Sequence, residues 1–133
     1  MYQKILVPLD GSEHSKRALH EAIGLSKMTN GTITLLNVQP NHSTSSVNHH
    51  PNDPSQSIVL TEGKKLVQEA GISVNTILLQ GNVIDQIVKT AKEEHSDLII
   101  VGARGLSKFE ELLLGSVSHG VLEKAPCPVI VTR

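Results

Sequence analysis

Short aliphatic runs alternate along the chain with longer segments in which apolar residues recur every three to four positions. The aliphatic runs predict five β-strands, at 5–7, 32–38, 73–79, 97–101 and 129–132. The longer segments predict four helices, at 13–28, at 55–70, from 82 onward and at 116–124. Because crossovers between parallel strands are right-handed, this alternation predicts an α/β fold whose parallel sheet carries helices on both faces.

Polar residues and glycines mark where the predicted helices begin and end. Ser12 is a candidate N-cap for the first helix, and Asn82 opens the most regular one with Asp85 at capping-box spacing. Asn30-Gly31 and Gly71 are typical of helix C-terminal ends.

Two segments lack a regular apolar pattern. Residues 39–54 contain three prolines and are mostly polar, which predicts a flexible loop. The segment from 102 to 115 predicts a second loop, with a short helix at Phe109–Leu114. The length of 133 residues, with no repeat and no linker, predicts one domain over 1–133.

Composition and charge exclude several classes of protein. Twelve Lys and Arg residues against thirteen Asp and Glu residues leave no polycation for nucleic acid, and Tyr2 and Phe109 alone cannot stack single-stranded bases. No apolar run is long enough to span a membrane, and no signal-peptide pattern is present, so we expect a cytoplasmic protein. Cys127, the single cysteine, excludes an intrachain disulfide.

The candidate chemistry lies directly after two of the predicted strands. Asp10 follows the first strand and Gly102 the fourth, and parallel sheets bind ligands at the carboxyl ends of their strands. From Gly102 to Ser116 the spacing is G-x2-G-x9-G-S. Glycines expose backbone N–H groups, and a helix N-terminus favours anions, so this unit suits a phosphate group. Arg104 and Lys108 lie inside it and would offset the charge of a phosphate.

The same residues also have a purely structural interpretation. Glycines after strands serve as turns, Gly-Ser before a helix serves as a cap, and Asp10 fits a plain turn. Neither a Walker A loop nor a G-x-G-x-x-G fingerprint occurs in the sequence.

The segment 102–133 resembles the C-terminal signature of the universal stress protein family. ILVPLDGS at 5–12 and SDLIIVG at 96–102 are similar to the first and fourth strands of that family, and the glycine spacing resembles its ATP-binding branch. The resemblance covers nearly the whole chain except 39–57. It implies a three-layer, adenine nucleotide alpha hydrolase-like fold with strand order 3-2-1-4-5 and a cleft between strands one and four.

The resemblance also implies a site for ATP or AMP. Asp10 would accept hydrogen bonds from the ribose or base, between walls formed by Pro8, Leu9 and Val101. Val38 would contact adenine through its backbone. The residues implied around the phosphates, mainly through main-chain N–H groups, are Gly102, Arg104, Gly105, Gly115, Ser116, Val117 and Ser118. Mg²⁺ or Mn²⁺ would be held mainly by the phosphates, with no protein metal ligands.

The remaining candidate residues favour plain structural roles. His42, His49 and His50 lie in the polar loop without a defined ligand set, which predicts a solvated segment. His119 could approach a phosphate or serve a surface or dimer contact. Cys127, between two prolines, is typical of a buried, unreactive thiol.

The last strand, within 128–133, follows the fourth strand and would form an edge of the sheet. Apolar edge strands invite pairing with another chain, and in the family this strand pairs across a two-fold axis, so we predict a homodimer.

Four functions fit these observations. The first is an ATP-binding regulatory or protective protein of the stress response, without catalytic residues. The second is an enzyme, an ATPase or nucleotidyl transferase on a similar fold. Glu110 and Glu111 are near the glycine unit, but no second acidic motif accompanies them, so we expect slow hydrolysis at most. The third is a dimeric interaction module that binds no nucleotide, and the fourth an electron-transfer flavoprotein-like module.

Overall fold

A computed structural model describes residues 1–40, 53–103 and 115–133. In chain order the elements are β1 (Lys4–Pro8), α1 (Glu13–Thr29), β2 (Thr32–Gln39), the 3-10 turn η1 (Pro54–Gln56), α2 (Ile58–Glu69), β3 (Val74–Gln80), α3 (Val83–Glu93), β4 (Leu98–Gly102), α4 (Ser116–Lys124) and β5 (Val129–Thr132). The five strands form one parallel sheet in the order β3-β2-β1-β4-β5, which confirms the expected fold class and strand order.

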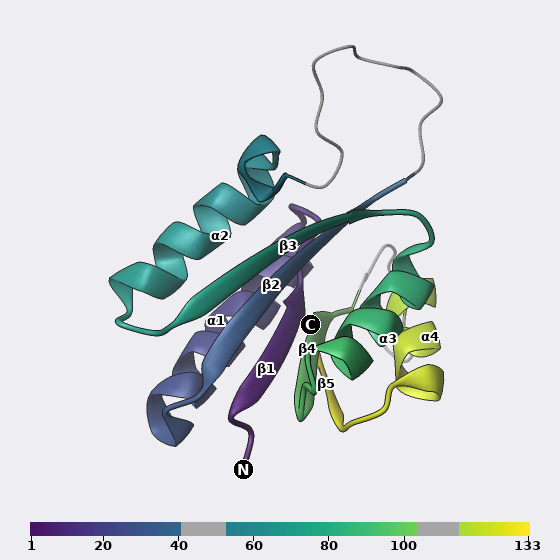
Figure 1. The fold of residues 1–133 in the computed structure, drawn as a ribbon. Helices are drawn as coiled ribbons and strands as arrows, with labels where there is room; N and C mark the ends of the chain where they lie inside the picture. Colours follow the sequence, from purple (N-terminus) through teal and green to yellow (C-terminus); the bar gives the residue numbers. More distant parts are fainter. Residues whose placement is uncertain (41–52, 104–114) are drawn as a thin grey trace.

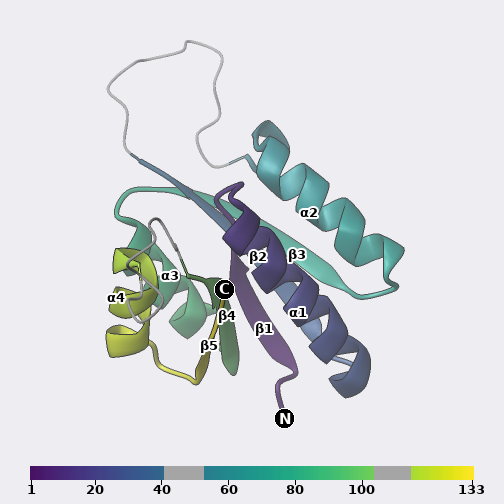
Figure 2. The same ribbon diagram turned by 180° about the vertical axis from the view of Figure 1, so that it is seen from behind.

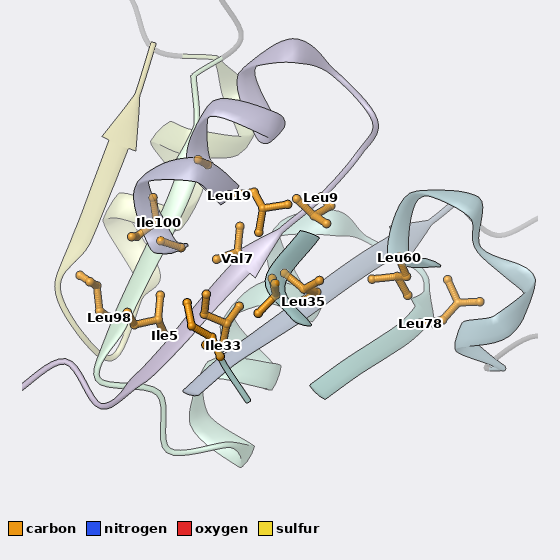
Figure 3. Close-up of a cluster of buried hydrophobic side chains, with 14 residues drawn as sticks. Ile5, Val7, Leu9, Leu19, Ile33, Leu35, Leu60, Leu78, Leu98 and Ile100 are labelled. Carbon is orange, nitrogen blue, oxygen red and sulfur yellow. The ribbon is translucent and has the colours of Figure 1, made fainter. Parts of the chain in front are cut away.

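The sheet is the middle of three layers. Helices α1 and α2 cover one face, and α3 and α4 cover the other (Figure 1); the view from behind shows α1 and α2 in front of the strands (Figure 2). Successive residues of β1 lie on opposite faces of the sheet. Ile5 and Val7 belong to the core beneath α1 and α2 (Figure 3), and Leu6 belongs to the core beneath α3 and α4. Burial on both faces explains why the neighbouring strands β1 and β4 carry unbroken aliphatic runs, Ile5–Val7 and Leu98–Val101.

The predicted helix caps are confirmed. The Ser12 hydroxyl accepts a hydrogen bond from the backbone N–H of Ser15 at 3.2 Å, and Asn82 Oδ1 accepts one from the N–H of Asp85 at 3.0 Å. Asn30 ends α1 in the left-handed conformation, with φ of 58°. These local bonds explain why helix ends could be placed from the sequence.

Helix α2 differs from its prediction in its start and in its buried face. It begins at Ile58, after η1, because the Ser57 side chain caps it. The apolar spacing within 55–70 predicts a buried face formed by Val59, Leu66, Val67 and Ala70, but Leu66 is 41% exposed, whereas Gly63 is buried. A Cβ on Gly63 would lie 2.7 Å from Leu9 Cδ1, so the glycine lets α2 approach the sheet closely. The short helix predicted at Phe109–Leu114 lies outside the described residues.

Candidate functional site

A cavity of about 420 Å³ lies at the carboxyl ends of β1, β2 and β4. It is lined by Pro8, Leu9, Asp10, Ser12, Ser15, Leu36, Asn37, Val38, Gln39, Pro40, Val59, Val83, Ile87, Val101, Gly102 and Val117. The chain leaves β1 toward β2 on one side and returns to β4 on the other, so the cavity marks the switch point of the sheet.

The turn after β1 places Asp10 at the cavity. The Leu9 N–H donates to the Leu36 carbonyl at 2.7 Å, which continues the sheet by one residue. Asp10 Oδ1 accepts a hydrogen bond from the Ser12 N–H at 2.9 Å, and Gly11 takes a φ of 86° that favours glycine. Asp10 therefore has the turn role that the sequence suggested, and it also lines the cavity.

Gly102 lines the cavity from β4 and has a packing role of its own. A Cβ at this position would lie 2.4 Å from the carbonyl carbon and oxygen of His14 and 2.8 Å from the Ser15 nitrogen. The first turn of α1 therefore lies directly against the end of β4, which only a glycine permits. This contact explains the glycine without reference to any ligand.

Aliphatic side chains from both strands and helices form the wall of the cavity. Val38 and Val101 come from strand ends, whereas Val83, Ile87 and Val117 come from α3 and α4. Aromatic side chains are absent from the described lining. A flat apolar group such as a base would therefore meet aliphatic surfaces.

The start of α4 lies beside this wall and carries the last part of the glycine unit. Gly115 is the N-cap, and as a glycine it has no side chain that could accept from the first N–H groups of the helix. The buried Ser118 hydroxyl donates to the Gly115 carbonyl at 3.0 Å. Ser116 is exposed at the first position of the helix.

The structure brings seven of the predicted site residues into the cavity lining: Pro8, Leu9, Asp10, Val38, Val101, Gly102 and Val117. Gly115, Ser116 and Ser118 lie at the start of α4 and are not part of the lining, and Arg104 and Gly105 lie outside the described residues. Nine further lining residues are absent from the predicted set: Ser12, Ser15, Leu36, Asn37, Gln39, Pro40, Val59, Val83 and Ile87. The last two carried a signal, since they are four residues apart directly after the Asn82 cap.

Two candidate residues outside the cavity have local partners. His119 Nε2 lies 2.8 Å from Glu123 Oε1 on the exposed side of α4. Burial raises the pKa of the Cys127 thiol, and the negative charge of Asp97 raises it further. The thiol is therefore protonated at neutral pH and a weak nucleophile. The histidines at 42, 49 and 50 lie outside the described residues, and among the described ones no three His, Cys, Asp or Glu side chains gather as metal ligands do.

The sequence profile of the Universal stress protein family matches residues 1–133. The chain belongs to the universal stress protein family. Universal stress protein YxiE of Bacillus subtilis (strain 168) is 36% identical over 148 residues, with 100% of both chains covered. The described part of this universal stress protein contains no helix long and apolar enough to cross a bilayer.

Solved structures show the same fold. The protein MJ0577 is 32% identical, with a TM-score of 0.79 and coverage of 99% of this chain and 96% of its own. A universal stress protein solved in complex with cAMP is 26% identical, with a TM-score of 0.77 and coverage of 99% and 97%. The adenine nucleotide alpha hydrolase-like architecture expected for this universal stress protein is thus confirmed.

Proposed function

We propose that this universal stress protein binds ATP or AMP in the cavity between β1 and β4, and that the nucleotide controls a regulatory or protective role in the stress response. The observation that carries the proposal is the cavity itself, at the switch point, with Asp10 on one side and aliphatic walls on the other. The cAMP complex of a related universal stress protein supports an adenine nucleotide as ligand.

The chemistry of the lining suits a nucleoside. At about 420 Å³ the cavity is within the usual size range of small-molecule sites. Val38, Val83 and Val101 offer aliphatic contacts to adenine, and the Val38 backbone offers hydrogen bonds to the base edge. The carboxylate of Asp10 suits the hydroxyl groups of ribose, because ionised acceptors form the stronger hydrogen bonds.

The phosphates would lie toward the start of α4. The N-terminal N–H groups of a helix attract anions, and Gly115 has no side chain to cap them. We assign Gly102, Gly115, Ser116, Val117 and Ser118 to this part of the site, mainly through their main-chain N–H groups. Arg104 and Gly105 complete the predicted set, and the phosphates would hold Mg²⁺ or Mn²⁺.

The lining favours binding over catalysis. Among the described residues that line the cavity, Asp10 is the only carboxylate. Phosphoryl transfer needs a group that positions the nucleophile and usually carboxylates that hold the metal ion. We therefore expect slow hydrolysis at most.

The test is to identify the nucleotide that the purified protein carries and to titrate it. Acid extraction is expected to release ATP or AMP, and calorimetry of the emptied protein is expected to show saturable binding of one nucleotide per chain. UTP serves as the control ligand for the base. An empty protein that gives no heat with ATP or AMP contradicts the proposal and favours a dimeric interaction module. Phosphate release above about 1 s⁻¹ instead indicates an enzyme.

We further propose that the protein is a homodimer through β5. In the described structure β5 pairs with β4 alone, and Ile130 in this edge strand is 41% exposed. Ile130→Asp is expected to convert the dimer into a monomer, because it introduces like charges at the shared edge. Light scattering after size exclusion measures the mass. Leu66→Asp, equally exposed on α2, is the control and is expected to remain dimeric.

A monomeric wild-type protein at micromolar concentration, or a dimer unaffected by Ile130→Asp, contradicts the β5 interface.

The cytoplasmic location expected from the sequence stays a prediction, which cell fractionation tests.

A further inference from the structure

Two buried polar side chains stand within the apolar layer between the sheet and α2. Asn37 in β2 is 7% exposed, and Ser57 before α2 is 3% exposed. The neighbouring residues on the same face of β2, Ile33 and Leu35, are fully buried and aliphatic. Polar groups in such a layer destabilise the fold unless they are hydrogen-bonded, so their partners explain why they are there.

The two side chains form one continuous chain of hydrogen bonds. Asn37 Nδ2 donates to the Leu9 carbonyl at 2.8 Å, and Asn37 Oδ1 accepts from the Ser57 hydroxyl at 3.0 Å. The Ser57 hydroxyl in turn accepts from the Leu60 N–H at 3.1 Å, which caps α2. The bonds run from the turn after β1, across β2, into the first turn of α2.

At the β1 end of this series of hydrogen bonds, the bonds fix a peptide plane of the candidate site. The Leu9 N–H is held by the Leu36 carbonyl, and the Leu9 carbonyl is held by Asn37. The Leu9 carbonyl belongs to the peptide that joins Leu9 to Asp10. Its orientation therefore sets the direction of the Asp10 N–H and the starting point of the Asp10 side chain.

At the other end the bonds position part of the cavity wall. Val59 lies in the first turn of α2 and lines the cavity. A Cβ on Gly11 would lie 3.4 Å from Val59 Cγ2, so this turn of α2 is in contact range of the loop that carries Asp10. One pair of side chains thus holds both Asp10 and Val59.

We propose that Asn37 and Ser57 are positioning residues of the nucleotide site. They act through the Leu9–Asp10 peptide and through the cap of α2, and they couple occupancy of the cavity to the order of the first turn of α2. This inference rests on the proposed nucleotide binding. Because coupling between two sites is reciprocal, a nucleotide that holds Asp10 in place also stabilises the capped start of α2.

The test compares variants of the two residues with a matched control. Ser57→Ala removes the link and the cap, and Asn37→Asp replaces the donor to Leu9 with an oxygen. Thr29→Val is the control, since the Thr29 hydroxyl likewise donates to one carbonyl, of Tyr2 at 3.0 Å, and accepts from one N–H, of Gly31 at 3.2 Å. Those bonds lie at the opposite end of the sheet.

Calorimetry with ATP is expected to show that Ser57→Ala lowers the affinity about tenfold relative to wild type and that Asn37→Asp lowers it by at least as much. The affinity of Thr29→Val is expected to stay within about twofold of wild type. Circular dichroism establishes that each variant is folded at the titration temperature. If Asn37→Asp is unfolded, the affinity of Ser57→Ala decides the test. In addition, hydrogen exchange at the Leu60 amide is expected to slow when ATP binds to wild type. That slowing is expected to be smaller in Asn37→Asp at saturating ATP.

The possible results distinguish failure of the positioning role from failure of the proposed nucleotide binding. A wild-type protein that binds no adenine nucleotide overturns both. Wild-type binding with unchanged affinity in folded Ser57→Ala overturns the positioning role alone. Equal weakening by Thr29→Val also overturns it, because the effect would then come from general loss of stability.

Discussion

Replacing Asp10 with alanine is expected to weaken ATP binding about 10- to 100-fold. A hydrogen bond to a charged group contributes about 1.5–3 kcal/mol, which is an affinity ratio of that size. The fold is expected to change little, because Asp10 is exposed and its Oδ1 bond to the Ser12 N–H is local. Calorimetric titration with ATP measures the loss, and thermal unfolding measures the stability.

Asp53 offers a matched control for this substitution. Its Oδ1 accepts a hydrogen bond from the Ser55 N–H at 3.0 Å, two residues on, as Asp10 does from Ser12, and a second one from the Ser55 hydroxyl at 2.7 Å. Asp53 does not line the cavity. Asp53→Ala is therefore expected to leave ATP affinity unchanged. Equal affinities for Asp10→Ala and wild type would show that Asp10 is only a turn residue.

Gly102→Ala is expected to lower the free energy of unfolding by about 1–3 kcal/mol. The added Cβ would approach the His14 carbonyl group to 2.4 Å, and backbone atoms cannot move aside as the end of a side chain can. Either α1 shifts along the sheet or β4 is displaced, and both disturb a closely packed core. Urea unfolding followed by circular dichroism measures the change, since the chain has no tryptophan.

Gly24→Ala is the matched control, and its effect is expected to have the opposite sign. Gly24 lies within α1, and beyond the backbone of that helix a Cβ there would meet no described atom within 4 Å. Alanine at this position is expected to stabilise the protein by about 0.5–1 kcal/mol, because glycine is the weaker helix former. If both variants lost similar stability, the close contact between α1 and β4 would be refuted.

Local signals in the sequence were sufficient for much of the fold. Ser12 and Asn82 begin helices through bonds to residues three positions on, so their roles are visible in a short window. The alternation of strands and helices predicted a parallel sheet. The strand order came from the family resemblance, because no local pattern states which strands are neighbours.

The buried face of α2 and many of the residues that line the cavity could not be predicted from the sequence, because they depend on contacts between residues far apart in the chain. Gly63 has no side chain to enter an apolar pattern, yet its contact with Leu9 decides which side of α2 faces the sheet. Asn37 is a polar interruption in an aliphatic strand, and its meaning requires Leu9 and Ser57, which lie 28 and 20 residues away. The glycine spacing predicts a phosphate contact at Gly102, whereas its packing role depends on the contact with α1.

The pairing of β1 with β4 also determines when the cavity can form during synthesis. Lys4 near the start of β1 donates its N–H to Asp97, 93 residues along the chain, and Ile5 pairs with Leu98. The central strand therefore leaves the ribosome long before its second neighbour, and pairing over such a separation slows folding. A nucleotide has no complete cavity to bind until β4 has been made. It can therefore stabilise the finished protein, but it cannot guide the early steps of folding.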